Sequence, residues 1–492
     1  MKVIVRRLFR DPVVVVLVIL GVCCTDHTSG GSTADAAFDS STSRDSDAPG
    51  DASDACVPIR IPTRPDSGKD ESPKLSFGCI EGWPEYTPPK PVASLSKPRL
   101  ELLGSDVPDA LDGGIVVASY GSPATYWGGR LGLSAGEILV SYNVLDRTWA
   151  FSDFFYTMGV ASPPAIRRNV PGGFVTGRNV VAGFRVDFEG LSGEFDPGGL
   201  PDWSFELGIG QQVAYSMLVH PDGTLYLTTN MRTIRAITPN GASIWEVSKW
   251  GTSTYYPESR FGLGDRVFVS GVGYHRKSGE EFDLPRFNGR SVRILGATYS
   301  RRLIGQYRGQ SHDREYTVLL DECGTHQATI PTFPDLFVYD VAAVGFNNSV
   351  LFTGVLETAQ RPVHFLVDTD GTVLSEPKNI ARDSGCAQRL ALGGDGIWYF
   401  AVCKICDGMS GDDLSLVALS PSLDIIDELD IGDSCYIGDA TLLDDGTMLL
   451  ARGANGYKLE FLRIATSSPG LARTAWPKAM RDNERTGWIA GW

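Results

Sequence analysis

Basic residues, histidines and long apolar runs are all scarce in this chain of 492 residues. Lysine and arginine together number 44 against 59 acidic residues, which leaves a formal net charge of −15 at pH 7. No basic stripe or mixed aromatic and basic run is present that would release counterions from nucleic acid. The composition therefore argues against nucleic acid and anionic membrane surfaces as partners, and it favours a soluble monomer.

The usual sequence motifs of catalysis and cofactor binding are also missing. The six histidines are scattered without His-x-His or HExxH spacing, and there is no G-x-S-x-G elbow, P-loop or G-x-G-x-x-G. Two short acidic turns, at Asp368 to Gly371 and Asp444 to Gly446, lack the later glutamate of a calcium loop. We therefore expect no metal and no cofactor.

The N-terminal residues 1–23 have the pattern of an export signal. Four basic residues precede or flank the start of an apolar run that is too short to span a bilayer comfortably. The run ends in Leu20-Gly-Val-Cys23-Cys24, which resembles the bacterial lipobox, so Cys23 or Cys24 is expected to carry a lipid anchor. The resemblance implies a lipoprotein of the bacterial cell envelope, anchored in the outer membrane and either periplasmic or surface-exposed; a secreted protein is the alternative.

Two further segments precede the expected domain. Residues 24–55 consist mainly of Ser, Asp, Ala, Thr and Gly, and such a segment buries too little apolar surface to fold, so it is expected to be a disordered tether. Residues 56–100 are rich in Pro and Lys and form an expected lead-in. In an oxidising compartment, Cys56 and Cys79 are predicted to form a disulfide with each other.

Residues 101–475 contain a repeated pattern of short strands and turns. In residues 220–247, three β-type runs at 224–229, 234–237 and 243–247 are separated by turn signals. Eight cores of a turn followed by an apolar run recur roughly 40 to 60 residues apart, as in four-stranded propeller blades; they lie at residues 112–117, 171–175, 222–227, 264–269, 300–304, 347–352, 395–400 and 445–450. The prediction is an all-β protein with a single β-propeller of eight blades, seven being possible. A pair of β-sandwiches is the architectural rival.

One part of the chain resembles the repeat of quinoprotein-type propellers, which includes a Gly-x-x-x-Trp turn. The matching residues are 225–227, 234–237 and Gly241-Ala-Ser-Ile-Trp245. Residues 476–492 resemble the closing motif of bacterial propellers in that group, with Trp476, Arg481, Asp482 and Gly487 at the matching positions. The resemblance implies a propeller fold. Because an open ring would expose a strand edge and an apolar face, we expect this closing segment to lie across the seam between the last blade and the strand near residues 100–117, with Trp476 buried.

Four cysteines fall within one expected blade and its border: Cys386, Cys403, Cys406 and Cys435. Cys403-Lys-Ile-Cys406 has the spacing of a redox or metal pair, but no second close pair completes a zinc site. The turn near residue 395 brings Cys386 alongside Cys403. We therefore predict a structural disulfide from Cys386 to Cys403 or Cys406.

Two classes of function remain compatible with these patterns. The leading hypothesis is a non-catalytic, membrane-tethered propeller that binds an envelope protein or glycan through the central face of the ring. The alternative is a propeller enzyme, either a degenerate quinoprotein dehydrogenase or a hydrolase whose acidic residues come from different blades. Tryptophans such as Trp203 and Trp245 belong either to a ligand-binding face or to the core between blades.

Overall fold

The computed structural model describes residues 76–84, 90–96, 99–107, most of 125–474, and 488–489; the longest stretches left out of 125–474 are 185–202, 249–259 and 404–413. The chain divides into two units, Met1–Ser72 and Pro73–Trp492. All described residues belong to the second unit. The predicted signal, the tether and the lipidation candidates Cys23 and Cys24 therefore lie outside the described residues.

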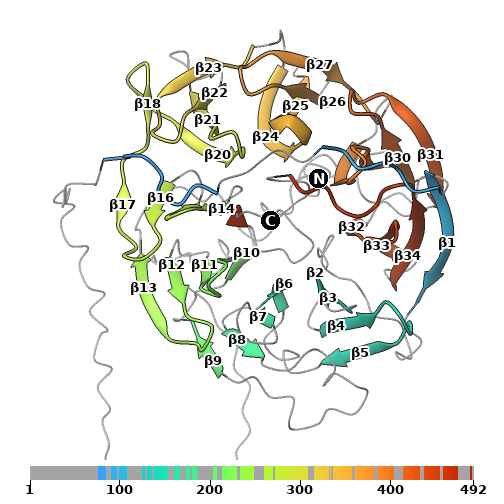
Figure 1. Ribbon diagram of the computed structural model, residues 1–492. Helices are drawn as coiled ribbons and strands as arrows, with labels where there is room; N and C mark the ends of the chain where they lie inside the picture. Colours follow the sequence, from blue (N-terminus) through green and yellow to red (C-terminus); the bar gives the residue numbers. More distant parts are fainter. Residues whose placement is uncertain are drawn as a thin grey trace, which may run out of the picture. The chain divides into compact units, whose positions relative to one another are not determined.

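The described strands form eight sheets of four or five strands, together with one two-stranded hairpin. We call each of the eight sheets a blade. The blades follow one another around a ring, with the first strand of each nearest the centre (Figure 1). The fold is thus an all-β propeller, as predicted from the sequence.

The strands of the first four blades are as follows. Blade 1 contains β2 (Thr125–Trp127), β3 (Arg130–Ala135), β4 (Ile138–Asn143) and β5 (Trp149–Ser152), and blade 2 contains β6 (Val160–Ile166), β7 (Gly173–Gly177), β8 (Val180–Phe184) and β9 (Trp203–Glu206). Blade 3 contains β10 (Val213–Val219), β11 (Leu225–Thr229), β12 (Thr233–Ile237) and β13 (Ser243–Ser248). Blade 4 contains β14 (Arg260–Leu263), β15 (Arg266–Val269), β16 (Val272–His275), β17 (Glu281–Phe282) and the added strand β35 (Trp488–Ile489).

The hairpin of β18 (Arg286–Phe287) and β19 (Arg290–Ser291) follows blade 4 and precedes the remaining blades. Blade 5 contains β20 (Arg293–Ala297), β21 (Leu303–Arg308), β22 (Glu315–Leu320) and β23 (His326–Thr329), and blade 6 contains β24 (Leu336–Val344), β25 (Val350–Leu356), β26 (Arg361–Val367) and β27 (Val373–Lys378). Blade 7 contains β28 (Cys386–Leu392), β29 (Trp398–Cys403), β30 (Leu414–Leu419) and β31 (Ile425–Gly432). Blade 8 contains β32 (Ile437–Leu442), β33 (Thr447–Ala454), β34 (Lys458–Thr466) and β1 (Leu100–Asp106).

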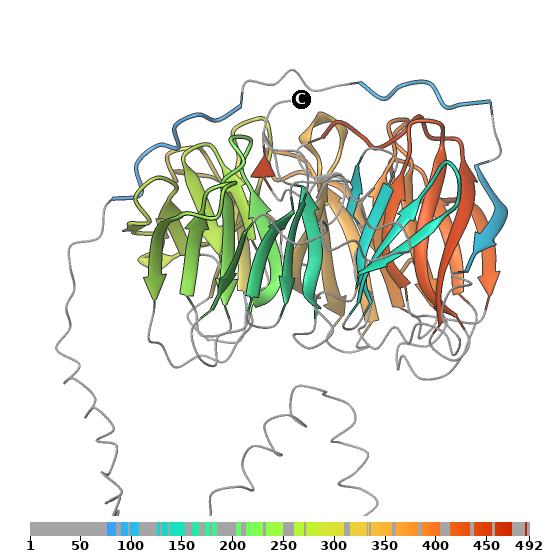
Figure 2. The ribbon, with the colours of Figure 1, turned by 90° about the horizontal axis from the view of Figure 1, so that it is seen from below.

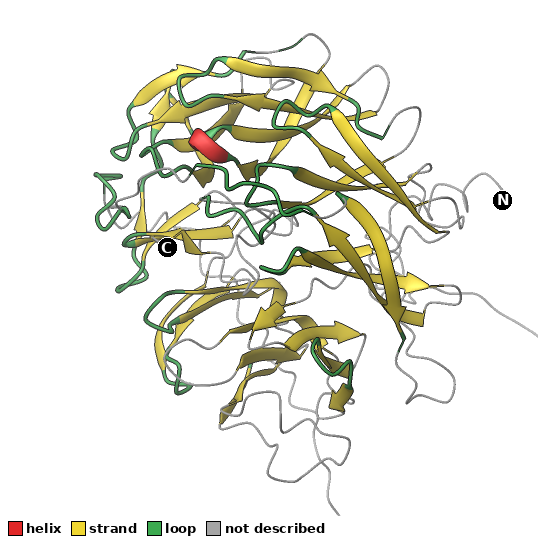
Figure 3. Cartoon of the chain, turned by 45° about the vertical axis from the view of Figure 1, so that its right-hand side comes forward, coloured by secondary structure: helices red, strands yellow, loops and turns green. Residues whose placement is uncertain are grey.

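Helical structure is minimal in the part of the chain that the structure describes, where the 3-10 turn η3 (Phe346–Asn348) is the one helical element (Figure 3). Within the same residues, no helix has the length and apolar character needed to cross a membrane.

The core lies between the blades, as expected for a ring of sheets that each pack against their two neighbours. Both faces of a blade are apolar and each is buried against a neighbouring blade. Between blades 4 and 5, for example, Phe261 and Phe268 pack with Leu303 and Val318, and all four are fully buried. Between blades 7 and 8, Tyr399 and Leu416 pack with Met448 and Leu462 in the same way.

The local sequence patterns account for the strands. The alternating run at 224–229 becomes β11, and the two runs that follow it become β12 and β13, with adjacent strands antiparallel. Seven of the eight turn-and-apolar cores lead into the second strand of a blade: β7, β11, β15, β21, β25, β29 and β33. The remaining core, at 112–117, lies outside the described residues.

The Gly-x-x-x-Trp pattern has a direct structural reason. Trp245 lies in the last strand of blade 3, and its indole packs against Gly279 in the β16–β17 turn of blade 4, where an added Cβ would lie 2.7 Å from Trp245 Cδ2. Trp245 Nε1 donates a hydrogen bond to the carbonyl of Arg276 in that turn, at 2.8 Å. Trp203 of blade 2 contacts Gly241 of blade 3 in the same way and donates to the carbonyl of Pro239 at 2.9 Å. These two tryptophans are therefore core residues between blades.

The ring is closed by β1, which pairs antiparallel with β34 from Leu100 opposite Thr466 to Asp106 opposite Phe461. An N-terminal strand thus completes the last blade. The predicted closure by the C-terminal segment is wrong for the part that is described, because β35 pairs parallel with β14, the innermost strand of blade 4. Figure 1 shows this short strand near the centre of the ring. Trp476, Arg481, Asp482 and Gly487 lie outside the described residues.

Candidate binding face

One face of the ring carries two sets of turns. Because adjacent strands are antiparallel, the turn between the first and second strands of a blade lies at the same end as the turn between its third and fourth strands. We call this end the turn face. The opposite end carries the connections that lead from one blade to the next.

The described parts of the lead-in, residues 76–84 and 90–96, run along the turn face (Figure 2). Its first part contacts turns of blades 4 and 5, where the Ile80 amide donates to the Glu322 carbonyl at 3.0 Å and the Asp265 amide donates to the Glu81 carbonyl at 3.0 Å. Its second part contacts blades 7 and 8, where the Val92 amide donates to the carbonyl of Gly394 and the Leu95 amide donates to that of Ser467. The chain then enters β1. The lead-in therefore connects four blades before it closes the ring.

Phe77 fills a position that tryptophan fills between earlier blades. Four residues after Gly279 stands Asp283 rather than tryptophan, so blade 4 has no indole at this position. The corresponding glycine of blade 5 is Gly324, and an added Cβ there would lie 2.8 Å from Phe77 Cδ1. Phe77 is 8% exposed and meets Phe282 edge to face at 5.4 Å between centroids. The Arg266 guanidinium lies over both rings, 4.2 Å from the centroid of Phe282.

A disulfide fixes this part of the lead-in to blade 5. Cys79 is bonded to Cys323 in the β22–β23 turn. The predicted Cys56–Cys79 pairing is therefore wrong. That prediction rested on closeness in sequence, whereas the lead-in brings Cys79 against a turn that follows 244 residues later. Cys323 was missed because its local sequence is an ordinary turn.

The second cysteine group is partly described. Cys403 is held in a disulfide, and Cys386 lies directly opposite it across β28 and β29. Cys406, Cys435 and Cys56 lie outside the described residues. The bond from Cys386 to Cys403 or Cys406 stays a prediction.

A histidine, a carboxylate and a guanidinium meet between blades 3 and 4. Asp222 Oδ1 lies 2.8 Å from His220 Nδ1, and Arg276 of the next blade pairs with Asp222 Oδ2. Burial acts to raise the pKa of Asp222, but hydrogen bonds from Thr224 and His220 outweigh it and hold that pKa well below its usual range. A carboxylate that stays ionised and paired is a poor general acid or base near neutral pH. The geometry favours a link between blades over a reaction centre.

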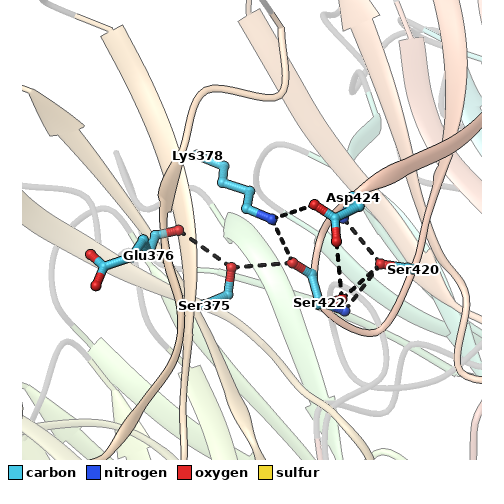
Figure 4. A network of polar contacts seen from close by, with 6 residues as sticks. All are labelled: Ser375, Glu376, Lys378, Ser420, Ser422 and Asp424. Carbon is cyan, nitrogen blue, oxygen red and sulfur yellow. Dashed lines mark hydrogen bonds and ion pairs between the residues drawn. The ribbon is translucent and has the colours of Figure 1, made fainter.

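A serine and lysine cluster lies between blades 6 and 7 (Figure 4). Lys378 Nζ donates to the Asp424 carboxylate at 2.7 Å and to the Ser422 carbonyl at 2.9 Å. Ser375 Oγ donates to the same carbonyl at 3.2 Å. The ammonium of Lys378 lowers the pKa of Asp424. Because both Ser375 and Lys378 point their protons at blade 7, neither activates the other for nucleophilic catalysis.

A third cluster ties the lead-in to the ring. Asp395 Oδ2 accepts hydrogen bonds from Ser94 Oγ at 3.0 Å and from Ser467 Oγ at 3.3 Å, while Asp395 Oδ1 accepts from the Ile397 amide. Burial raises the pKa of the neighbouring Tyr399, and the Asp395 charge acts in the same direction. One carboxylate thus joins the lead-in, blade 7 and blade 8.

Metal-ligand geometry was sought in the same part of the chain. Among the residues that the structure describes, no group of three or more His, Cys, Asp or Glu side chains is arranged to hold a metal ion. The turn carboxylates instead accept backbone amides within their own turns, as Asp321 and Asp370 do. These residues act in folding the turns.

Comparisons with known proteins give only distant similarity. No protein-family model matches the chain, and no curated protein has a significantly similar sequence. Solved structures that it resembles include BamB from Moraxella catarrhalis, with 12% identity over 74% of this chain and 99% of that one and a TM-score of 0.46. The C-terminal WD40 domain of Sif2 has 10% identity over 75% and 98%, with a TM-score of 0.46. A streptogramin B lyase has 10% identity over 71% and 96%, with a TM-score of 0.38.

Proposed function

We propose that this protein is a non-catalytic propeller scaffold of the bacterial cell envelope that binds a protein or glycan through the faces and rim of its ring. In this proposal a lipid on Cys23 or Cys24 anchors the chain in the outer membrane, and residues 24–55 serve as a tether. The functional element is the rigid ring itself.

The observation that carries this proposal is that polar side chains on the turn face join neighbouring parts of the ring. The clusters around Asp222, Asp424 and Asp395 each span two or more neighbouring parts of the ring. Residue types that serve as catalysts elsewhere are here engaged in joining one blade to the next. Such a ring presents fixed turns to a partner, which is what a binding scaffold requires.

The test examines, in the intact protein, both its attachment to the membrane and the partner that it binds. Crosslinking of the membrane-attached chain, followed by mass spectrometry, should recover a recurrent partner whose crosslinks map to the ring. A double C23S and C24S variant should leave the membrane fraction or remain unprocessed. Membrane retention with normal processing in that variant would contradict the lipid anchor.

The enzyme alternative predicts a different outcome. A hydrolase built from carboxylates on different blades should turn over a glycan or peptide substrate, and that turnover should be lost on substituting two acidic residues of separate blades. Turnover of envelope polysaccharide by the purified full-length chain would overturn the scaffold proposal.

A further inference from the structure

The β18–β19 hairpin stands outside the four-stranded repeat. It lies between the last strand of blade 4 and the first strand of blade 5, and the Val292 amide donates to the Pro285 carbonyl at its base, at 2.8 Å. Asn288 and Gly289 at its tip both have positive φ, at 50° and 75°, as a tight two-residue hairpin requires. Figure 1 shows it on the outer rim of the ring, near β22 and β23.

The charge of this region is opposite to that of the whole chain, so the expectation that the sequence contains no mixed aromatic and basic run is wrong here. Residues 284–312 contain six arginines and no aspartate or glutamate, although the chain as a whole has a net charge of −15. Two of these arginines, Arg286 and Arg290, belong to the hairpin, where Arg286 is exposed and Arg290 is partly exposed. The adjacent carboxylate in sequence is that of Asp283, before the hairpin. Arg301 pairs with Glu322, and Arg308 lies opposite Glu315 across β21 and β22. The excess positive charge is therefore expected mainly at the hairpin, where it would attract anions.

Aromatic rings lie beside these charges. Phe287 is partly exposed, stacks on His326 at 4.2 Å between centroids and meets Tyr307 at 5.2 Å. Tyr307 in turn stacks on Tyr316 at 5.4 Å. Arg290 is directly paired with Phe287 across the hairpin, so the two side chains share a face of it. A guanidinium and an aromatic edge are thus presented together.

We infer that the hairpin is a binding site for an anionic polysaccharide, with the Arg290 guanidinium taking an acidic group and the edge of Phe287 contacting its sugar rings on one face. Arg286 is paired with Ser291 on the opposite face and takes acidic groups of the same polymer from that side. Guanidinium is planar and binds carboxylate or phosphate in a two-point geometry. An aromatic ring supplies the apolar surface that a sugar ring can cover, whereas an acidic peptide would need the arginines alone. The inference rests on the proposed function only in that the partner is an envelope macromolecule.

The experiment measures binding of the full-length protein to immobilised polygalacturonate at two salt concentrations, with dextran as the neutral polysaccharide. Binding to polygalacturonate, weakened by salt and absent on dextran, is the expected result. The R286A and R290A double variant should bind about tenfold more weakly or worse, the equivalent of about 1.4 kcal/mol. The F287L variant, which keeps an apolar side chain but loses the ring, should bind several-fold more weakly.

The matched control is R301A, because Arg301 belongs to the same acid-free run but lies in the β20–β21 turn and pairs with Glu322 at 3.4 Å. Equal losses in R301A and in the R286A and R290A double variant, or no polygalacturonate binding by the parent, would overturn the inference. Equal affinity for polyglutamate or for a single-stranded oligonucleotide would show a general anion surface and overturn the polysaccharide assignment. A partner crosslinked elsewhere on the ring, with no polysaccharide bound, would leave the scaffold proposal standing while this inference fails.

Discussion

Single residues in this propeller act mainly at the contacts between blades. Gly279 has a φ of +73° and faces the Trp245 ring, so this position needs a residue that adopts positive φ and that has no side chain. The sequence pattern predicted the turn and the strand around such positions. The inter-blade contact could not be predicted, because the indole comes from one blade and the glycine from the next.

Replacing Gly279 with alanine should destabilise the protein more than the same change at Gly289. Gly289 has a nearly equal φ of +75°, but an added Cβ there would meet nothing within 4 Å. G289A therefore isolates the backbone strain, about 1 kcal/mol. G279A should cost about 2–3 kcal/mol because the Trp245 ring must also move. Urea unfolding followed by tryptophan fluorescence measures both, and equal losses would show that the ring contact carries no weight.

His364 makes stability depend on pH. It is 2% exposed, and Thr353 Oγ1 lies 3.2 Å from its Nδ1. Burial lowers the pKa of His364 from 6.5 to about 4, and the nearby Arg389 guanidinium acts in the same direction. The unfolded chain therefore takes up a proton as pH falls below about 6.5, whereas the folded chain does so only near pH 4. The contribution of the neutral His364 to the free energy of unfolding is therefore fully present above the unfolded pKa of about 6.5. It is lost as the pH falls from there toward 4, a decrease of about 3 kcal/mol.

An H364Q variant should lose this part of the pH dependence. Unfolding free energies measured from pH 7 to pH 4 should fall less steeply in the variant than in the parent, whatever its stability at pH 7. H326Q, which changes a partly exposed histidine, provides the matched comparison. If H364Q and the parent have parallel pH profiles, another group titrates in this range.

At the scale of elements, local turn chemistry predicted much of the repeat. Second strands such as β11, β15 and β33 each follow a turn with Asp or Gly, since each blade must reverse the chain there. The second strand of blade 1, β3, was not among the predicted cores, and it follows the pair Gly128-Gly129 without an acidic turn residue. The path of the lead-in was also unpredictable, because its contacts with Asp265, Glu322 and Gly394 are set by tertiary structure.

The lead-in is predicted to be a structural part of the ring rather than a loose connection. F77A should destabilise the protein by about 3 kcal/mol or more, because a buried ring that packs on Gly324 and Phe282 is removed. V92A is the control within the same segment, since Val92 is 60% exposed. Thermal unfolding with the disulfide intact should separate the two variants. A melting temperature for F77A equal to that of V92A would mean that Phe77 does not support the blade 4 and blade 5 contact.

For the whole molecule, the decisive contact is the seam between blade 8 and blade 1. The Tyr142 hydroxyl donates to the Asp106 carboxylate, and the Tyr142 ring lies 5.0 Å from that of Phe461. Arg463 Nη1 donates to the Val144 carbonyl at 3.1 Å. Burial, together with the Asp106 hydrogen bond, raises the pKa of Tyr142 to about 12, so this donor stays protonated at physiological pH. Sequence reasoning required a closure of the ring but assigned it to residues 476–492, of which the described pair 488–489 lies beside blade 4, and it did not predict the closure by β1.

Two truncations that differ only in β1 should distinguish an open from a closed ring. A chain that begins at residue 99 loses the lead-in but keeps β1, whereas a chain that begins at residue 108 loses both. Without β1, the edge of β34 is exposed and the Tyr142 hydroxyl loses its partner Asp106, and unpaired edges promote aggregation. The longer chain should therefore be monomeric in size-exclusion chromatography, and the shorter one should aggregate or melt well below it. A third chain that ends at residue 474 should stay monomeric, because it lacks β35 but retains the seam. A monomeric chain from residue 108 with the melting temperature of the chain from residue 99 would show that β1 does not close the ring.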